Sequence, residues 1–274
     1  MTKEEFVKNA LEEDIGRGDL FERTILPAPY SAYIVSKDVG VFAGEEYARV
    51  LLELFDARYE FLVKDGEEIT RGQKLLRLQG ANTDILKLER TLLNMLQHAS
   101  GIASNAAIFA KLGAKHNVSA LDTRKTRAGM RVFEKYAARV GGVKNHRFGL
   151  DDALMIKDTH LQAIDDLESY IQNARKNIPF TAKIEIECES VEAAKEAIAL
   201  GVDIVMCDNM TPKDVAQVVS FKNQINNKIL LECSGSIDEK SFEEYAKTGV
   251  DAISIGKIIH QAVWLDFSMK GVRA

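Results

Sequence analysis

The feature that most constrains the fold is a series of short apolar runs from about residue 117 onward, each ending in a polar or small residue. From the third run they recur about every 20 to 25 residues with helical patterns between them, as in βα units with short loops. The six runs are VSALD (118–122), ALMIKD (153–158), KIEIE (183–187), DIVMCD (203–208), ILLEC (229–233) and AISIG (252–256). We predict a parallel barrel or partial barrel, with its chemistry at the carboxyl ends of the strands. A doubly wound sheet stays open as an alternative, although no GxGxxG motif follows any run.

The first hundred residues have a different pattern, in which strand-like segments and helices are separated by glycine turns. SAYIVS, YEFLV and KLLRL are strand-like, and LKLERTLLNMLQHASGIA has the apolar spacing of a long helix. The chain is therefore predicted to be α/β, with an N-terminal α+β domain before the barrel. We place an N-terminal sandwich domain at 1–104, the barrel at 105–260, and a C-terminal helix at 261–274 that returns to the first domain.

Composition and charge exclude several classes of protein. With 46% hydrophobic and 28% charged residues, the chain of 274 residues is typical of a globular protein. No apolar run approaches the roughly 18 residues of a membrane span, and the acidic N-terminus lacks the apolar stretch of a signal peptide. Three scattered cysteines without metal-ligand spacing favour the cytoplasm. The net charge of −5 argues against nucleic-acid binding.

Cations are nevertheless concentrated between Arg124 and Lys157, a segment that contains nine Lys or Arg residues and three acidic residues. A local cation excess in an acidic protein predicts a small anionic ligand. Arg124 and Arg147 suit a carboxylate held by paired hydrogen bonds, and Lys125 and Lys157 act as point charges.

Acids and small residues follow the later strands. Glu187 and Asp208 are one βα unit apart and suit a hard ion such as Mg²⁺, shared with substrate phosphates. The SGS stretch at 234–236 and the SIGK stretch at 254–257 leave backbone N–H groups accessible to a phosphate. The strand ends together predict a phosphorylated substrate with Mg²⁺ beside a small carboxylated one.

A set of motifs, taken in order, resembles the quinolinate phosphoribosyltransferase family, also called nicotinate-nucleotide pyrophosphorylase (carboxylating). The resemblance runs from about residue 8 to 265. The motifs are EDIGRGDLFERTI, ERTLLNMLQHASGIAS, DTRKTRAGMR, GGVKNHRFGLDD with LMIKDTH, and the KIEIE and CDNM pair. Each motif alone is weak, whereas the set with these separations is specific.

The resemblance implies an N-terminal α/β sandwich domain, an open α/β barrel, Mg²⁺ as cofactor, and a homodimer or a multiple of dimers. It assigns the catalytic roles to Lys125, Lys157, Glu187 and Asp208. It assigns quinolinate binding to Thr123, Arg124, His146, Arg147 and Lys157, with Arg90 reaching in from the partner subunit. It assigns phosphoribosyl pyrophosphate binding to Lys125, Glu187, Asp208, Ser234, Gly235, Ser236, Ser254, Gly256 and His260.

The sequence departs from the family pattern at Ala128, Thr159 and Ser236, where relatives often have Pro, Asn and Gly. These departures concern loop shape, because a serine tolerates positive φ less easily than a glycine does. His160 is open between a helix cap and a residue close behind the site.

The implied reaction transfers a phosphoribosyl group to quinolinate with loss of CO₂, forming nicotinate mononucleotide in NAD biosynthesis. Three alternatives stay open: a phosphoribosyltransferase for nicotinate or another pyridine carboxylate, a relative encoded beside molybdate transporters, and a non-catalytic metabolite-binding protein.

Overall fold

The computed structural model describes residues 2–225 and 228–272, which form two compact units. One unit comprises residues 1–107, 133–142 and 261–274, and the other comprises residues 108–132 and 143–260. The 35-residue helix α3 (Asn82–His116) contributes its first part to one unit and its last turns to the other. No helix within the described ranges is long and apolar enough to cross a membrane.

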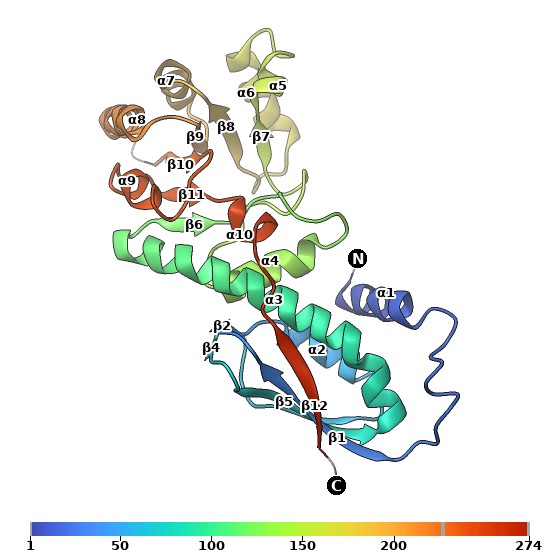
Figure 1. Cartoon of the computed structure of the whole chain (residues 1–274). Helices are drawn as coiled ribbons and strands as arrows, with labels where there is room; N and C mark the ends of the chain where they lie inside the picture. Colours follow the sequence, from blue (N-terminus) through green and yellow to red (C-terminus); the bar gives the residue numbers. More distant parts are fainter. Residues whose placement is uncertain (1, 226–227, 273–274) are drawn as a thin grey trace. The chain divides into compact units, whose positions relative to one another are not determined.

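The first unit is built on a four-stranded antiparallel sheet of order β12-β1-β5-β3 (Figure 1). Besides the first part of α3, its elements are α1 (Lys3–Ile15), β1 (Pro29–Ser36), β2 (Gly40–Val41), α2 (Glu45–Leu52), β3 (Arg58–Phe61), β4 (Glu68–Ile69), β5 (Lys74–Ala81), most of α4 (Arg131–Val140) and β12 (Phe267–Val272). Local sequence explains where α1 begins. Thr2 and Glu5 form a capping box at the start of α1. The α+β domain predicted for the N-terminal part of the chain is confirmed.

The predicted C-terminal helix is wrong. Phe267–Val272 is a strand, and it pairs antiparallel with β1 from Ser36↔Phe267 to Ser31↔Val272. In Figure 1 this strand lies beside β1. The edge of β1 supplies backbone hydrogen-bond partners that a helix in this position would leave unused, and Phe267 is buried there.

The second unit is a six-stranded parallel sheet of order β6-β11-β10-β9-β8-β7 with helices between the strands. Its elements are β6 (Ser119–Leu121), β7 (Leu154–Ile156), α5 (Asp158–Leu161), α6 (Leu167–Asn177), β8 (Ile184–Cys188), α7 (Val191–Ala199), β9 (Ile204–Asp208), α8 (Pro212–Ile225), β10 (Leu230–Ser234), α9 (Phe242–Ala246), β11 (Ala252–Ser254) and α10 (Lys257–His260). All six strands coincide with the six apolar runs of the sequence. In the described part of the chain β6 and β7 are the two ends of the sheet, so the unit is an open α/β barrel, as predicted.

Successive side chains of each strand point to opposite faces of the sheet, so that one face carries packing residues and the other carries candidate site residues. In β8, Glu185 and Glu187 share the inner face, while Ile184, Ile186 and Cys188 take the other face and are buried. Parallel pairing aligns the carboxyl ends of the strands, so that Ser234 lies opposite Asp208. The last inward side chains of successive strands are therefore brought to one edge.

Candidate active site

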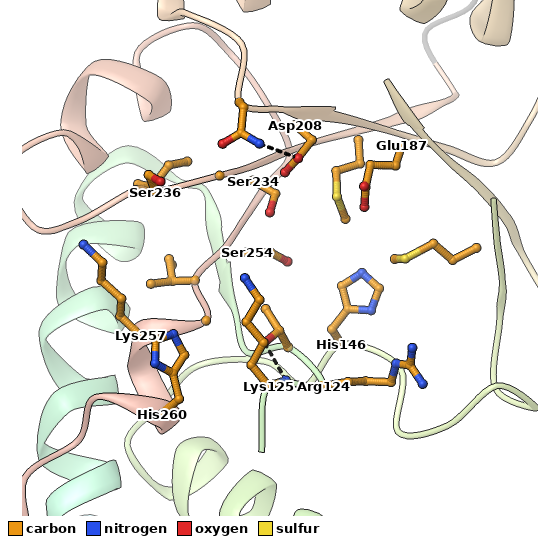
Figure 2. Close-up of a pocket in the computed structure, with 18 of the residues that line it drawn as sticks. Arg124, Lys125, His146, Glu187, Asp208, Ser234, Ser236, Ser254, Lys257 and His260 are labelled. Atoms are coloured by element: carbon orange, nitrogen blue, oxygen red, sulfur yellow. Dashed lines mark hydrogen bonds between the residues drawn. The ribbon is translucent and has the colours of Figure 1, made fainter. Parts of the chain in front are cut away.

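A cavity of about 750 Å³ lies at the carboxyl ends of the barrel strands. Its size is within the range of small-molecule sites, and all its lining residues belong to the second unit. Figure 2 shows Arg124 and Lys125 on one side of this cavity, and Glu187 and Asp208 on the opposite side. The lining residues are Thr123, Arg124, Lys125, Arg131, His146, Arg147, Met155, Lys157, Glu187, Met206, Asp208, Asn209, Ser234, Gly235, Ser236, Ile237, Ser254, Ile255, Gly256, Lys257 and His260.

Every site residue predicted from the sequence lines this cavity, except Arg90. The predicted set therefore converges from the ends of all six barrel strands onto one space. Arg90 is exposed on α3 in the first unit.

The cationic side of the cavity begins directly after β6. The Lys125 N–H donates to Thr123 Oγ1 at 3.0 Å, and this hydrogen bond shapes the turn that carries Arg124 and Lys125. Arg147 is 8% exposed, and its guanidinium donates to the Ala153 carbonyl at 3.1 Å and to Met155 Sδ at 3.4 Å. Burial and the nearby Arg124 lower the pKa of Arg147. A buried guanidinium whose charge is disfavoured by a second guanidinium beside it forms a site suited to an anion.

The acidic side is formed by β8 and β9. Glu187 Oε2 forms an ion pair with Lys157 Nζ, which follows β7. Asp208, at the end of β9, accepts a hydrogen bond from Asn209 Nδ2 at 2.7 Å. The cysteines next to these acids, Cys188 and Cys207, take the opposite face of their strands and are buried, and burial raises the pKa of each thiol to about 12. The donor set at this part of the cavity therefore consists of oxygens.

The turn after β10 forms the third side of the cavity. Gly235 has φ +98°, and a Cβ there would lie 2.3 Å from Asn209 Oδ1 and 2.6 Å from Asn209 N. Only glycine therefore fits this close approach of two loops. Ser236 also has positive φ, at 52°, so the turn keeps its left-handed shape despite the serine. Gly256 lies less close to a neighbour, since a Cβ there would meet the Lys125 side chain at Cδ, 2.9 Å away.

A buried polar cluster lies behind the cationic side. His146 Nε2 is 3.4 Å from Glu185 Oε2 and 3.3 Å from Glu232 Oε2, and Ser254 Oγ donates to the other oxygen of Glu232. Burial raises the pKa of the Glu185 carboxyl group.

Among the described residues these are the one group of at least three His, Cys, Asp or Glu donors within metal-binding reach of one another. However, His146 Nδ1 accepts the Arg147 N–H at 2.7 Å. This hydrogen bond places the ring proton on Nε2, the atom that a metal would need. In this arrangement the Nε2 proton of His146 therefore lies toward Glu185 and Glu232, in the place that a metal ion would take.

Sequence reasoning missed several lining residues, among them Arg131, Met155, Met206, Asn209 and Lys257. The sequence could have indicated two of these residues, because Asn209 directly follows the predicted site residue Asp208 and Lys257 directly follows Gly256. The methionines are inward positions one or two residues before a strand end, which strand alternation alone identifies. No local pattern identifies Arg131, because its position depends on a distant contact. Its guanidinium donates to the Phe148 carbonyl at 2.9 Å, 17 residues away in the sequence.

His160 caps a helix. Its Nδ1 accepts the Lys157 N–H at 2.9 Å at the start of α5, and its side chain is exposed outside the cavity lining. Of the two roles left open for His160, the cap is the one that its contacts support.

An open α/β barrel whose strand ends converge on a cavity with opposed cations and carboxylates defines an enzyme that handles small anionic substrates. The sequence profile of the quinolinate phosphoribosyl transferase C-terminal domain matches residues 102–270, and that of the N-terminal domain matches residues 19–100. The chain thus belongs to the quinolinate phosphoribosyltransferase family.

Individual proteins are similar over nearly the whole chain. The probable nicotinate-nucleotide pyrophosphorylase (carboxylating) of Synechocystis is 40% identical over 96% of this chain and 90% of its own length. The nicotinate-nucleotide pyrophosphorylase (carboxylating) of Rattus norvegicus is 31% identical over 89% of this chain and 82% of its own. The solved structure of the nicotinate-nucleotide pyrophosphorylase from Francisella tularensis matches with a TM-score of 0.92 and 32% identity, covering 98% of this chain and 96% of its own.

Proposed function

We propose that this protein transfers the phosphoribosyl group of phosphoribosyl pyrophosphate to the ring nitrogen of quinolinate. The 2-carboxylate then leaves as CO₂, and the products are nicotinate mononucleotide and pyrophosphate. The names of the relatives support this reaction. The observation that carries it is the single cavity with two guanidinium groups on one side and two strand-end carboxylates on the other.

The cationic side suits quinolinate. Arg124 and Arg147 each present a planar fork that matches a carboxylate, and Lys157 adds a point charge beside them. Two carboxylates on one small ring need this much positive charge, whereas nicotinate would need only half of it. Thr123, at the start of the same turn, lines the cavity and is expected to contact a ring substituent.

The opposite side suits the phosphoribosyl donor. Glu187 and Asp208 are oxygen donors on adjacent strands, a set that fits Mg²⁺ held jointly with substrate phosphates. Bound there, Mg²⁺ would neutralise charge on the departing pyrophosphate. Lys125 adds a cation to the same task. The ribose phosphate is expected near the small residues of the two last strand ends, namely Ser234, Gly235, Ser236, Ser254 and Gly256, together with His260.

The chemistry requires positioning more than proton transfer. The bond from the anomeric carbon to pyrophosphate breaks as the ring nitrogen bonds to that carbon, through a transition state with oxocarbenium character. The pyridine nitrogen has no proton to lose, so no general base is needed. The pyridinium ring then accepts the electron pair released when the 2-carboxylate leaves as CO₂, and carbon 2 takes up a proton. This accounts for a site rich in cations and poor in bases.

The assembly belongs to the same proposal. We infer a homodimer, or a multiple of dimers, in which the exposed Arg90 of one subunit completes the quinolinate site of its partner, as a two-fold interface permits. The three cysteines are free thiols, which is consistent with the cytoplasm as the compartment.

Product analysis tests the proposed reaction. The purified protein, incubated with quinolinate, phosphoribosyl pyrophosphate and Mg²⁺, should form nicotinate mononucleotide and release one CO₂ per turnover. Chromatography and trapping of labelled CO₂ measure the two products. Consumption of nicotinate in place of quinolinate would instead identify a nicotinate phosphoribosyltransferase, and binding without turnover would identify a metabolite-binding relative.

A further inference from the structure

The loop Asn145–Arg147 is held from two sides by acids to which the reaction assigns no role. On one side, the fully buried Asp122, which directly follows β6, accepts hydrogen bonds from the His146 N–H at 2.8 Å and from Asn145 Nδ2 at 2.6 Å. On the other side, the His146 ring extends to Glu185 on β8 and Glu232 on β10. The loop therefore connects three strands of the barrel.

The contacts on both sides of the loop affect the position of Arg147. Since Nδ1 of His146 accepts the Arg147 N–H at 2.7 Å, the imidazole ring and the backbone of Arg147 hold each other in one orientation. The ring in turn is oriented by the carboxylates at Nε2, and Ser254 orients Glu232. Both ring nitrogens of His146 are thus occupied by the protein, so the ring acts on a ligand through Arg147.

This arrangement is costly for a barrel interior. Glu185 is 0% exposed, and within the described residues its carboxylate lies 3.4 Å from His146 Nε2 without a hydrogen bond to either oxygen. Glu232 is 3% exposed. Burying carboxylates destabilises a fold unless they are well paired, and apolar side chains would fill the same space at lower cost. A requirement for precise loop geometry explains why acids occupy these positions.

We propose that Asp122, Glu185 and Glu232 are positioning residues that act through His146 to hold Arg147 in the geometry that binds a substrate carboxylate. This inference rests on the proposed function. It assigns the acids a role separate from that of Glu187 and Asp208, which face the phosphoribosyl donor.

A pair of substitutions at Glu232 separates positioning from charge. Glu232→Gln and Glu232→Leu both remove the negative charge, but only the glutamine keeps an oxygen that can accept the Nε2–H. If the acid acts only by its charge, both variants should bind anionic quinolinate as well as or better than the wild type. If it positions the loop, Glu232→Leu should weaken quinolinate binding at least 10-fold, and Glu232→Gln by less than about 3-fold.

Calorimetry of the full chain with quinolinate, and separately with phosphoribosyl pyrophosphate and Mg²⁺, measures both affinities. The loss should be confined to quinolinate. In an Arg147→Ala background, Glu232→Leu should cost less than a further 2-fold, because residues that act through one another are not additive. Glu134→Gln is the matched control, since Glu134 is a buried glutamate 2.9 Å from another histidine, His98, in the first unit. It should leave both affinities unchanged.

Asp122→Asn extends the test if Glu232→Leu does not fold, as judged by its thermal unfolding. This variant replaces one acceptor oxygen of Asp122 with a donor group, and it should weaken quinolinate binding several-fold without affecting the other ligand. Equal losses for both ligands, additive losses with Arg147→Ala, or unchanged quinolinate affinity would overturn the inference. A wild-type protein that does not bind quinolinate at all would overturn the proposed function and this inference together.

Discussion

Lys157 and Glu187 form an ion pair between two neighbouring strand ends, β7 and β8. The lysine side chain is 37% exposed and the glutamate 12%. The proposed function places these two residues in different half-sites, one toward quinolinate and one toward the phosphoribosyl donor. Without ligands, each neutralises part of the charge that the other half-site would use.

Glu187→Gln should therefore affect the two substrates in opposite directions. Quinolinate should bind several-fold more tightly in the absence of Mg²⁺, because Lys157 loses a partner whose attraction is worth about 1 kcal/mol at this exposure. Binding of phosphoribosyl pyrophosphate with Mg²⁺ should weaken. Calorimetry with each ligand checks both, and weaker quinolinate binding would contradict the competition for Lys157.

Arg124→Ala should weaken quinolinate binding by about 2 to 5 kcal/mol, because a substrate carboxylate in a partly desolvated site is left unpaired. Arg124→Lys should recover part of this loss, since it restores the charge but lacks the planar fork. The affinity for phosphoribosyl pyrophosphate should change little. Arg175→Ala, on the exposed side of α6, is the control and should bind both ligands normally. Similar losses for both substrates would remove Arg124 from the quinolinate half-site.

Asp208→Ala should greatly reduce turnover and raise the Mg²⁺ concentration needed for half-maximal rate, because one of two carboxylate donors is lost. Quinolinate binding without the second substrate should stay near normal. Initial rates across a Mg²⁺ titration measure the first effect, and calorimetry the second. Near-normal rates at limiting Mg²⁺ would mean that Asp208 is only a solvated strand end.

Arg90→Ala and Lys125→Ala should each be almost inactive as pure proteins. If Arg90 acts in the partner's site, a dimer with one chain of each kind has one intact site and one doubly defective site. Equal co-expression with random pairing gives about half hybrid dimers, so about a quarter of all sites should work.

Purification through two different tags isolates the hybrid dimers for the assay. Hybrids as inactive as the parent proteins would show that Arg90 acts within its own chain or has no role in the site. Arg90→Lys offers a milder variant, because it keeps the charge across the interface.

Gly235→Ala and Ser236→Gly should have opposite effects on stability. The alanine Cβ would overlap Asn209, 2.3 Å from its Oδ1, and the variant should lose both stability and phosphoribosyl pyrophosphate binding. Ser236→Gly removes a left-handed serine and should stabilise the protein by up to about 1 kcal/mol, the αL cost less the added entropy of glycine. Urea denaturation of both variants measures the changes, and a destabilised Ser236→Gly would contradict the strain at this turn.

Much of the barrel was predictable because its determinants are local. Each β-strand of the sheet is a short apolar run, and Glu187, Asp208 and Lys157 stand directly where such a run ends. Parallel strands carry their carboxyl ends to one edge whatever their order in the sheet. The convergence of Lys157, Glu187 and Asp208 on one cavity therefore followed from strand assignment alone.

Tertiary structure decided whatever depends on contacts between distant residues. The last segment of the chain becomes strand β12 because β1 offers it an edge. The paired residues Ser36 and Phe267 lie about 230 positions apart in the sequence. In the same way, His146 meets Glu185 and Glu232 only after the barrel has formed, although all three stand in recognisable strands or motifs. Residue type and local pattern determined which chemistry the chain carries, while the packing of the barrel determined which carboxylates face a metal and which hold a loop, because hydrogen bonds depend on distance in space and not on separation in sequence.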